Sequence, residues 1–245
     1  MEVSEKINFI SNWIKSYVEK MPNSAESLVI GISGGIDSSV SSTLSAMTGL
    51  KTIVISMPIK QKSIQHDLSL KHQEWLVNNF KNVEAHTLNL DKLFISFENS
   101  LSDFDNDRGM ANSRARLRMT TLYQVASANK GIVVGTGNKV EDFGVGFYTK
   151  YGDGGVDISP IADCNKTDVW EMGRELNILK EIIDAAPTDG LWDDGRTDEG
   201  QLGLKYSELE EAMNNLNSSN REKYEKIRKL NLHKMEPIPV CKIPN

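Results

Sequence analysis

Cysteine is scarce in this 245-residue sequence, which contains only Cys164 and Cys241. Two cysteines so far apart cannot build a disulfide framework, and the lack of a CxxC motif or a Cys/His cluster argues against a structural zinc site. Long apolar runs are also missing. None approaches the roughly 20 residues that span a membrane, and the charged, amphipathic N-terminal segment lacks the apolar core of a signal peptide. We therefore expect a cytoplasmic protein that does not contact a membrane.

Positive charge is in short supply as well. The 28 Lys and Arg residues against 34 Asp and Glu residues give a net charge of −6 at pH 7, so a surface that coats nucleic acid is not expected. An acidic protein can still bind anions through backbone N–H groups, a few placed basic side chains and a metal ion. The 39% hydrophobic and 25% charged content is typical of an ordinary globular protein.

Short apolar runs rich in β-branched residues alternate with segments in which apolar residues recur at helical spacing. The apolar runs predict strands over residues 28–33, 52–57, 84–90, 132–136 and 156–159. The helical spacing predicts helices over residues 4–21, 38–47, 64–80, 114–129, 165–176, 206–216 and 224–230. The polar, turn-rich segments 102–112 and 189–203 are expected to be loops.

Strands that are apolar throughout, rather than alternating, indicate a parallel sheet covered on both faces. We predict an α/β fold: one doubly wound parallel sheet of about five strands flanked by helices, in a single domain over residues 1–245. The N-terminal helix within 1–22 and the C-terminal helices within 204–232 are expected as additions. Asn165 is a candidate N-cap with Asp168 at the third helical position. In such sheets ligands bind at the carboxyl ends of the strands.

A glycine-rich turn follows the first expected strand and reads Ser33-Gly-Gly-Ile-Asp-Ser38. Glycines expose successive N–H groups and the following helix adds positive charge, which suits a phosphate. The loop is not GxxxxGK[ST], because no lysine follows the glycines. A carboxylate would repel the phosphate, so Asp37 is expected to hold a divalent cation that bridges to it. The alternative is a tight strand–helix turn in which Asp37 is a simple helix-start residue.

This turn resembles the pyrophosphatase-type ATP loop of the N-type ATP pyrophosphatases, which cleave ATP between the α and β phosphates. Further motifs, in the same order, are similar to those of the ammonia-dependent NAD synthetases in that superfamily: residues 112–119 (NSRARLRM), 135–141 (GTGNKVE), 147–161 (FYTKYGDGGVDISPI), 186–188, 191–192, 197–200 and 233–234. The resemblance runs from about residue 28 to 234. It implies an adenine nucleotide alpha hydrolase-like fold.

The resemblance implies a ligase that makes NAD from deamido-NAD. ATP adenylates the nicotinate carboxylate and releases pyrophosphate, and ammonia then displaces AMP, with Mg²⁺ as cofactor. Only about 27 residues precede the first strand and no glutaminase portion is visible, so free ammonia is the expected nitrogen donor. Two alternatives stay open: another amidating or thiolating ATP pyrophosphatase, and a nucleotide-binding regulator without catalysis. A thiolating enzyme should carry cysteines near the ATP loop and a basic face, and neither is evident.

The resemblance also implies roles for individual residues. The matching metal ligands are Asp37 and Glu141, which together with Lys166 are the expected catalytic positions. The expected ATP-binding residues are Gly31, Ile32, Ser33, Gly34, Gly35, Ile36, Asp37, Ser38, Thr136, Lys166 and Thr188. The expected deamido-NAD contacts are Arg116, Lys150, Asp157, His233 and Lys234. Each has a plain alternative as a turn residue or a solvated side chain, and Arg114, Arg116 and Arg118 cannot share one helix face.

Three further expectations concern the surroundings of the site. The segments 102–112 and 189–203 are candidate lids that would keep water from the adenylate. Cys164 is expected to be a small buried hydrophobe rather than a reactive thiol, and residues 141–150 are expected to be one residue longer than the common family pattern. The family implies a homodimer. The apolar stripe of the helix at 4–21 suits either that interface or ordinary core packing.

Overall fold

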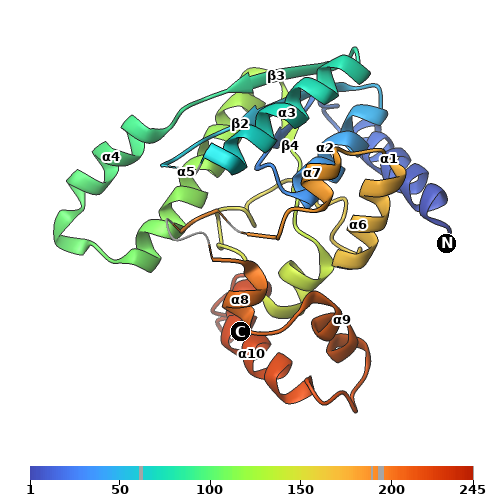
Figure 1. Ribbon diagram of the computed structural model, residues 1–245. Coiled ribbons are helices and arrows are strands. Elements are labelled where there is room, and N and C mark those ends of the chain that lie inside the picture. Colours follow the sequence, from blue (N-terminus) through green and yellow to red (C-terminus); the bar gives the residue numbers. More distant parts are fainter. Residues whose placement is uncertain (61–62, 189, 193–195, 245) are drawn as a thin grey trace.

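A parallel four-stranded sheet lies at the centre of the computed structural model, which describes residues 1–60, 63–188, 190–192 and 196–244 (Figure 1). The strands are β1 (Ser27–Gly31), β2 (Lys51–Ser56), β3 (Val83–Thr87) and β4 (Gly131–Val133), in the order β3-β2-β1-β4. β1 pairs in parallel with β2 and β4, and β2 pairs in parallel with β3. The predicted α/β fold with a parallel sheet is confirmed, with four strands instead of about five.

The fifth predicted strand, residues 156–159, was wrong as a strand. Its strand pairing among the described residues is limited to an isolated parallel bridge between Val134 and Ile158. The Asp157 carboxylate accepts the N–H of Val133 at 2.7 Å, a donor that a continuing ladder would use. Pro160 follows at once and has no N–H to extend the pairing.

Helices cover both faces of the sheet. Alternate residues of β1, β2 and β4 contribute to the two cores, whereas β3 packs Val83 and Ala85 against the first core only. On one face, Leu28 and Ile30 pack with α1 (Val3–Lys20), α2 (Ile36–Met47), α3 (Ser63–Asn79) and α6 (Lys166–Glu175). On the other, Val29 and Ile53 pack with α4 (Asp91–Ser100) and α5 (Asp107–Ala128). Burial on both faces explains why β1, β2 and β4 are largely apolar, and the exposed Glu84 and His86 of β3 fit its position at the sheet edge.

The first and sixth helices follow the sequence patterns closely. The stripe Ile7, Ile10, Ile14 and Val18 of α1 is buried in the first core, so core packing accounts for that stripe. In α6, Asn165 and Asp168 form the predicted capping box, with the Asn165 N–H donating to the Asp168 carboxylate at 2.8 Å.

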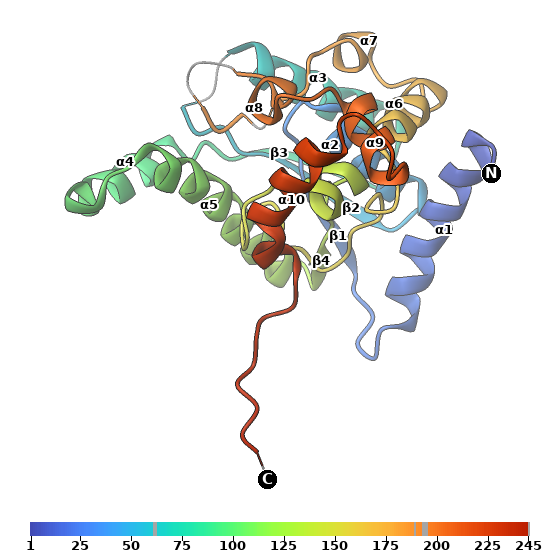
Figure 2. The same cartoon turned by 90° about the horizontal axis from the view of Figure 1, so that it is seen from below.

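The segment 102–112 was predicted as a loop, and most of it is helical. A short 3₁₀ helix, η1 (Ser102–Phe104), precedes α5, which starts at Asp107 instead of residue 114. Asn106 caps α5 by accepting the N–H of Gly109 at 2.6 Å. Together α4 and the first part of α5 form an arm that projects from the body in both views (Figures 1 and 2). A helix that projects in this way shows little apolar periodicity, because few of its faces are buried.

The C-terminal part packs around its own apolar cluster, next to the carboxyl ends of the strands (Figure 1). It contains α8 (Asp198–Leu202), α9 (Tyr206–Asn214), α10 (Arg221–Met235) and a π-helical turn, η2 (Lys139–Val145), while α7 (Lys180–Ile183) contacts α6. A π-helical turn takes in more residues per turn than an α-helix. Within the described ranges, no helix is long and apolar enough to cross a membrane.

Candidate active site

The glycine-rich turn joins the carboxyl end of β1 to the first turn of α2. Gly34 has φ +88°, a left-handed conformation that favours glycine. The turn is braced internally, because the Ser33 N–H donates to Ser38 Oγ and the Gly35 N–H donates to Ser33 Oγ, both at 3.2 Å. Gly35 is the N-cap of α2 and offers no side-chain acceptor. The first-turn N–H groups of α2 are therefore available to an anion.

One pocket at the strand ends contains every residue that the sequence assigned to ATP. It is lined by Gly31, Ile32, Ser33, Gly34, Gly35, Ile36, Asp37, Ser38, Thr136, Lys166 and Thr188, and also by Glu141. These residues come from the end of β1, the segment after β4, the start of α6 and the segment after α7. The parallel topology brings them together, because carboxyl ends of neighbouring parallel strands meet at one edge.

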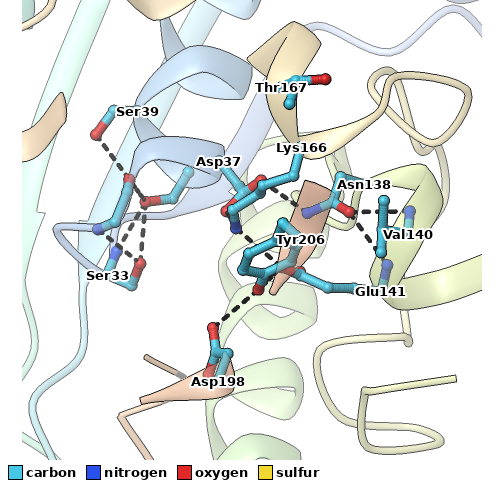
Figure 3. A network of polar contacts seen from close by, with 12 residues as sticks. Ser33, Asp37, Ser39, Asn138, Val140, Glu141, Lys166, Thr167, Asp198 and Tyr206 are labelled. Carbon is cyan, nitrogen blue, oxygen red and sulfur yellow. Dashed lines mark hydrogen bonds and ion pairs between the residues drawn. The ribbon is translucent and has the colours of Figure 1, made fainter. Parts of the chain in front are cut away.

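Three charged side chains meet at the centre of this pocket (Figure 3). Lys166 Nζ lies 2.5 Å from Asp37 Oδ2 and 2.8 Å from Glu141 Oε1. The exposed fractions of the three side chains are 2% for Lys166, 18% for Asp37 and 15% for Glu141. A buried ammonium is therefore enclosed between two carboxylates that approach it from different elements.

These groups shift one another's pKa. Burial would lower the pKa of Lys166, but the two carboxylates outweigh it and raise that pKa, so the lysine stays charged. Burial would likewise raise the pKa of Glu141, but Lys166 and the hydroxyl of Tyr206 lower it overall. Burial and the charge of Glu141 raise the pKa of Asp37 despite its ion pair with Lys166.

A second set of side chains holds the carboxylates in place, and the sequence reasoning missed these roles. Asn138 Nδ2 donates to Asp37 Oδ1 at 2.9 Å, while its Oδ1 accepts the N–H of Glu141 at 3.1 Å. The Tyr206 hydroxyl donates its one proton to Glu141 Oε1 at 2.5 Å, and the same hydroxyl oxygen lies 3.2 Å from Asp198 Oδ2 (Figure 3). Asn138 lies inside the GTGN motif, which could have indicated its role. Tyr206 was interpreted only as one of the apolar residues that predict the helix over residues 206–216.

The donor set is suited to a hard divalent cation. Asp37 and Glu141 supply carboxylate oxygens, the ligands that Mg²⁺ prefers. Among the described residues, however, no group of three or more His, Cys, Asp or Glu side chains is placed to hold a metal ion. Mg²⁺ commonly binds through one or two carboxylates plus substrate phosphates, so the two carboxylates fit a metal that ATP helps to bind.

The expected deamido-NAD residues do not line this pocket. Arg116 donates to the Lys150 carbonyl at 3.3 Å and Lys150 Nζ donates to the His233 carbonyl at 3.3 Å, so three of them form one neighbouring group. Lys234 Nζ donates to the Tyr148 carbonyl at 2.7 Å. Asp157 is bound to the end of β4, where it also accepts from the Tyr123 hydroxyl at 3.1 Å.

Other residues of the same motifs do face the pocket. Arg118 lines it, one turn of α5 after Arg114, whose side chain is buried and donates to the Leu191 carbonyl at 3.0 Å. Asp142 and Asp153 line it as well. Burial raises the pKa of Asp153 to about 6 and raises that of Asp142 well above its ordinary value.

Two further sequence expectations concern Cys164 and the candidate lid at 189–203. Cys164 is buried and free, and burial raises the pKa of its thiol to about 11, so it is the inert hydrophobe that was expected. Of the candidate lid 189–203, residues 189 and 193–195 lie outside the described residues. Within the rest, Thr197 caps α8 and the Asp198 N–H donates to the Pro187 carbonyl at 3.0 Å.

Comparison with known proteins gives one consistent result. The family model for NAD synthase matches residues 6–243. The NH(3)-dependent NAD(+) synthetase of Mesoplasma florum is 35% identical over 240 residues, which cover 96% of this chain and 95% of that protein. The solved NMN synthetase from Francisella tularensis has a TM-score of 0.91 at 32% identity and covers 99% of this chain and 100% of its own. The solved NH3-dependent NAD synthetase from Campylobacter jejuni, with a TM-score of 0.79 at 21% identity and coverage of 99% and 100%, shares the fold.

Proposed function

The chain belongs to the NAD synthase family, and on that premise we propose that it is a ligase that converts deamido-NAD to NAD. In this reaction ATP adenylates the nicotinate carboxylate with release of pyrophosphate, and ammonia then displaces AMP. The observation that carries the proposal is the Asp37–Lys166–Glu141 cluster beside the glycine-rich turn, in one pocket at the strand ends. A nucleotide-binding regulator would have less need for such a cluster.

The chemistry requires no nucleophile from the protein. The substrate carboxylate attacks the α-phosphorus of ATP, pyrophosphate leaves, and ammonia attacks the acyl adenylate. The residues therefore bind, orient and neutralise charge. The turn at 33–38 and the first N–H groups of α2 would hold phosphate oxygens, Lys166 would neutralise phosphate charge, and Thr136 and Thr188 would contact the nucleotide from the pocket walls.

Mg²⁺ is part of this proposal, with Asp37 and Glu141 as its protein ligands. When bound, the ion would offset the charge that develops on the pyrophosphate as it leaves. The fit rests on the two carboxylate donors and on the triphosphate as the source of further oxygen ligands. Asn138 and Tyr206 would keep the carboxylates oriented through their hydrogen bonds.

Arg116, Lys150, Asp157, His233 and Lys234 remain our proposed contacts for deamido-NAD. Arg116, Lys150 and His233 contact one another through backbone carbonyls, and the cationic groups of Arg116 and Lys150 suit the phosphates of a dinucleotide. Arg118, which lines the ATP pocket, is a further candidate for a phosphate contact. Asp157, by contrast, is already bound to the backbone of β4.

A second candidate substrate is supported by one specific observation. The TM-score to the NMN synthetase of Francisella tularensis is 0.91, against 0.79 for the NAD synthetase of Campylobacter jejuni. Amidation of nicotinate mononucleotide would use the same ATP pocket and the same kind of acyl-adenylate intermediate. The two substrates would differ only in the AMP half of deamido-NAD, which nicotinate mononucleotide lacks.

The experiment compares deamido-NAD with nicotinate mononucleotide as substrates of the purified chain, with ATP, Mg²⁺ and ammonium. We expect amide product, AMP and pyrophosphate in equal amounts, with ammonium a better nitrogen donor than glutamine. The substrate with the higher kcat/KM identifies the physiological class. An Asp37→Ala variant should lose the activity. ATP binding without release of pyrophosphate in the presence of either substrate would contradict the proposal.

We also propose that the protein is a cytoplasmic homodimer that uses the α4–α5 arm as its interface. Large apolar side chains are exposed along this arm, namely Leu93 at 51%, Ile95 at 44% and Phe104 at 76%, and Leu88 just before α4 is 37% exposed. An apolar projection of this kind favours association with a second copy. The cytoplasm is the compartment that supplies ATP, and the two cysteines are both free, as in a reducing compartment.

A further inference from the structure

Lys166 occupies the space in which a metal held by both carboxylates would bind. Its ammonium contacts Asp37 Oδ2 at 2.5 Å and Glu141 Oε1 at 2.8 Å, with the lysine side chain only 2% exposed (Figure 3). A divalent cation held between the two carboxylates would lie directly against this ammonium. The two cannot occupy this space together, because like charges repel strongly where water is excluded.

The carboxylates cannot complete a metal site without help from a ligand. Among the described residues, no third His, Cys, Asp or Glu is placed to hold a metal ion together with them, whereas Mg²⁺ requires about six oxygen ligands. A metal that replaced Lys166 without ATP would therefore have only two protein ligands. It would also leave a buried ammonium without its anionic partners. Both effects disfavour the replacement of Lys166 by the metal.

A triphosphate removes both obstacles. Its oxygens would supply the missing metal ligands, and they would also offer the displaced ammonium a new anionic partner. Lys166 is in the first turn of α6 and shares the pocket with the phosphate-binding turn at 33–38. Its long side chain can reach either partner through changes of rotamer alone.

We propose that Lys166 is a resident counter-ion that fills the metal position in the nucleotide-free protein and gives it up only when a triphosphate arrives. The divalent cation then enters with ATP and does not bind beforehand. The inference rests on the proposed function, because it needs ATP and a metal at this pocket. It goes further by fixing the order in which the metal and the nucleotide can be bound.

The test measures direct binding of Mn²⁺, followed by the electron paramagnetic resonance signal of the free ion. The probes are Mn²⁺ alone and Mn²⁺ with α,β-methylene-ATP, which cannot be cleaved at the reacting bond. We expect the wild-type chain to bind Mn²⁺ at least about tenfold more tightly with the analogue than without it. A Lys166→Met variant, which removes the ammonium and keeps the length of the side chain, should bind Mn²⁺ without nucleotide at least about tenfold more tightly than wild type.

The matched control is Lys139→Met. Lys139 pairs with Asp163 at 2.9 Å on the surface, so this variant loses the same charge without opening the space between Asp37 and Glu141. It should bind Mn²⁺ as the wild type does. Wild-type protein that binds Mn²⁺ alone as tightly as Lys166→Met does would overturn the inference.

Two outcomes keep the test decisive if one arm fails. Should Lys166→Met not fold, as judged by circular dichroism, the wild-type titrations decide, and Mn²⁺ affinity that does not respond to the analogue refutes the inference. Should the chain bind no analogue by calorimetry, the proposed function fails instead. The comparison of Lys166→Met with wild type in the absence of nucleotide then still decides whether the lysine holds the metal position.

Discussion

At the scale of single residues, the account depends on two carboxylates and one ammonium. Asp37, Glu141 and Lys166 together carry one net negative charge in a space that is largely closed to water. A carboxylate in this position can pair first with the lysine and then with a metal, so its charge matters more than its shape.

Glu141→Gln should therefore lower kcat/KM by about 100-fold and raise the Mg²⁺ concentration for half-maximal activity by about tenfold. The amide keeps the size of the side chain and can still accept from Tyr206, but it loses the charge. The matched control is Glu210→Gln, because Glu210 accepts from Thr167, next to Lys166, at 2.9 and 2.7 Å without entering the cluster. Pyrophosphate release measured against Mg²⁺ concentration checks this. Equal losses in the two variants would show that charge at Glu141 has no special role.

His72 should make the stability depend on pH. It is fully buried beside Ser42, and burial lowers its pKa from 6.5 to about 4. Between those pH values the unfolded chain binds a proton that the folded chain does not. The stabilisation is complete above pH 6.5 and is lost progressively as the pH falls toward 4, by about 3 kcal/mol in all.

Urea unfolding at pH 7 and pH 4.5 tests this for wild type, His72→Gln and the control His86→Gln at an exposed position on β3. Other groups titrate in all three chains, so the comparison isolates the contribution of the His72 imidazole to the pH dependence of stability. We expect His72→Gln to lose about 2–3 kcal/mol less than wild type between the two pH values, and His86→Gln to behave as wild type does. Identical losses for wild type and His72→Gln would refute the assignment.

Residues inside motifs could be predicted from the sequence, while residues that support them could not. Asp37 and Glu141 stand at strand ends in recognisable patterns, and the structure places them in one pocket with Lys166. Tyr206 and Asp198 reach the same cluster from the C-terminal helices. Their part depends on how α8 and α9 pack against η2, and no local spacing encodes that packing.

At the scale of elements, the turn between β1 and α2 places a strict conformational requirement on its residues. Gly34 has φ +88° there, and Gly49 has φ +78° after α2, with no atom within 4 Å of an added Cβ. Both positions favour glycine for the same reason, and only the first lies in the pocket.

Gly34→Ala and Gly49→Ala should each cost about 1–2 kcal/mol of unfolding free energy, because alanine is strained at positive φ. Only Gly34→Ala should weaken ATP binding, by about tenfold or more, since it alone disturbs the phosphate-binding turn. Calorimetric ATP titration beside urea unfolding separates the two effects. An unchanged ATP affinity in Gly34→Ala would remove this turn from the binding site.

Elements buried on a sheet face were easier to predict than exposed ones. The four strands and α1, α2 and α6 follow apolar patterns because burial imposes them. The start of α5 has no such pattern, since it lies on the projecting arm, and the strand at 156–159 was interrupted by the side chain of Asp157 and by Pro160. Both errors come from interactions that a local pattern does not contain.

At the scale of the whole molecule, the proposed homodimer depends on the apolar side chains that are exposed on the projecting arm. Leu93→Glu with Phe104→Glu should convert the dimer to a monomer, because two charges would be buried at its interface. The control is Leu216→Glu with Leu230→Glu, two sites that are 77% and 79% exposed elsewhere. Light scattering after gel filtration should give twice the 27.3 kDa chain mass for wild type and control, and the single mass for the arm variant. A wild-type monomer, or a dimer that survives the arm substitutions, would contradict this interface.

The central claim is that this pocket activates a carboxylate by adenylation, and oxygen-isotope transfer tests it most directly. The substrate is deamido-NAD with oxygen-18 in both carboxylate oxygens, turned over with ATP, Mg²⁺ and ammonium, and the products are examined by mass spectrometry. The account predicts one labelled oxygen in the phosphate of AMP, one in the amide of NAD, and none in pyrophosphate. Label in inorganic phosphate with release of ADP, or AMP that carries no label, would contradict it.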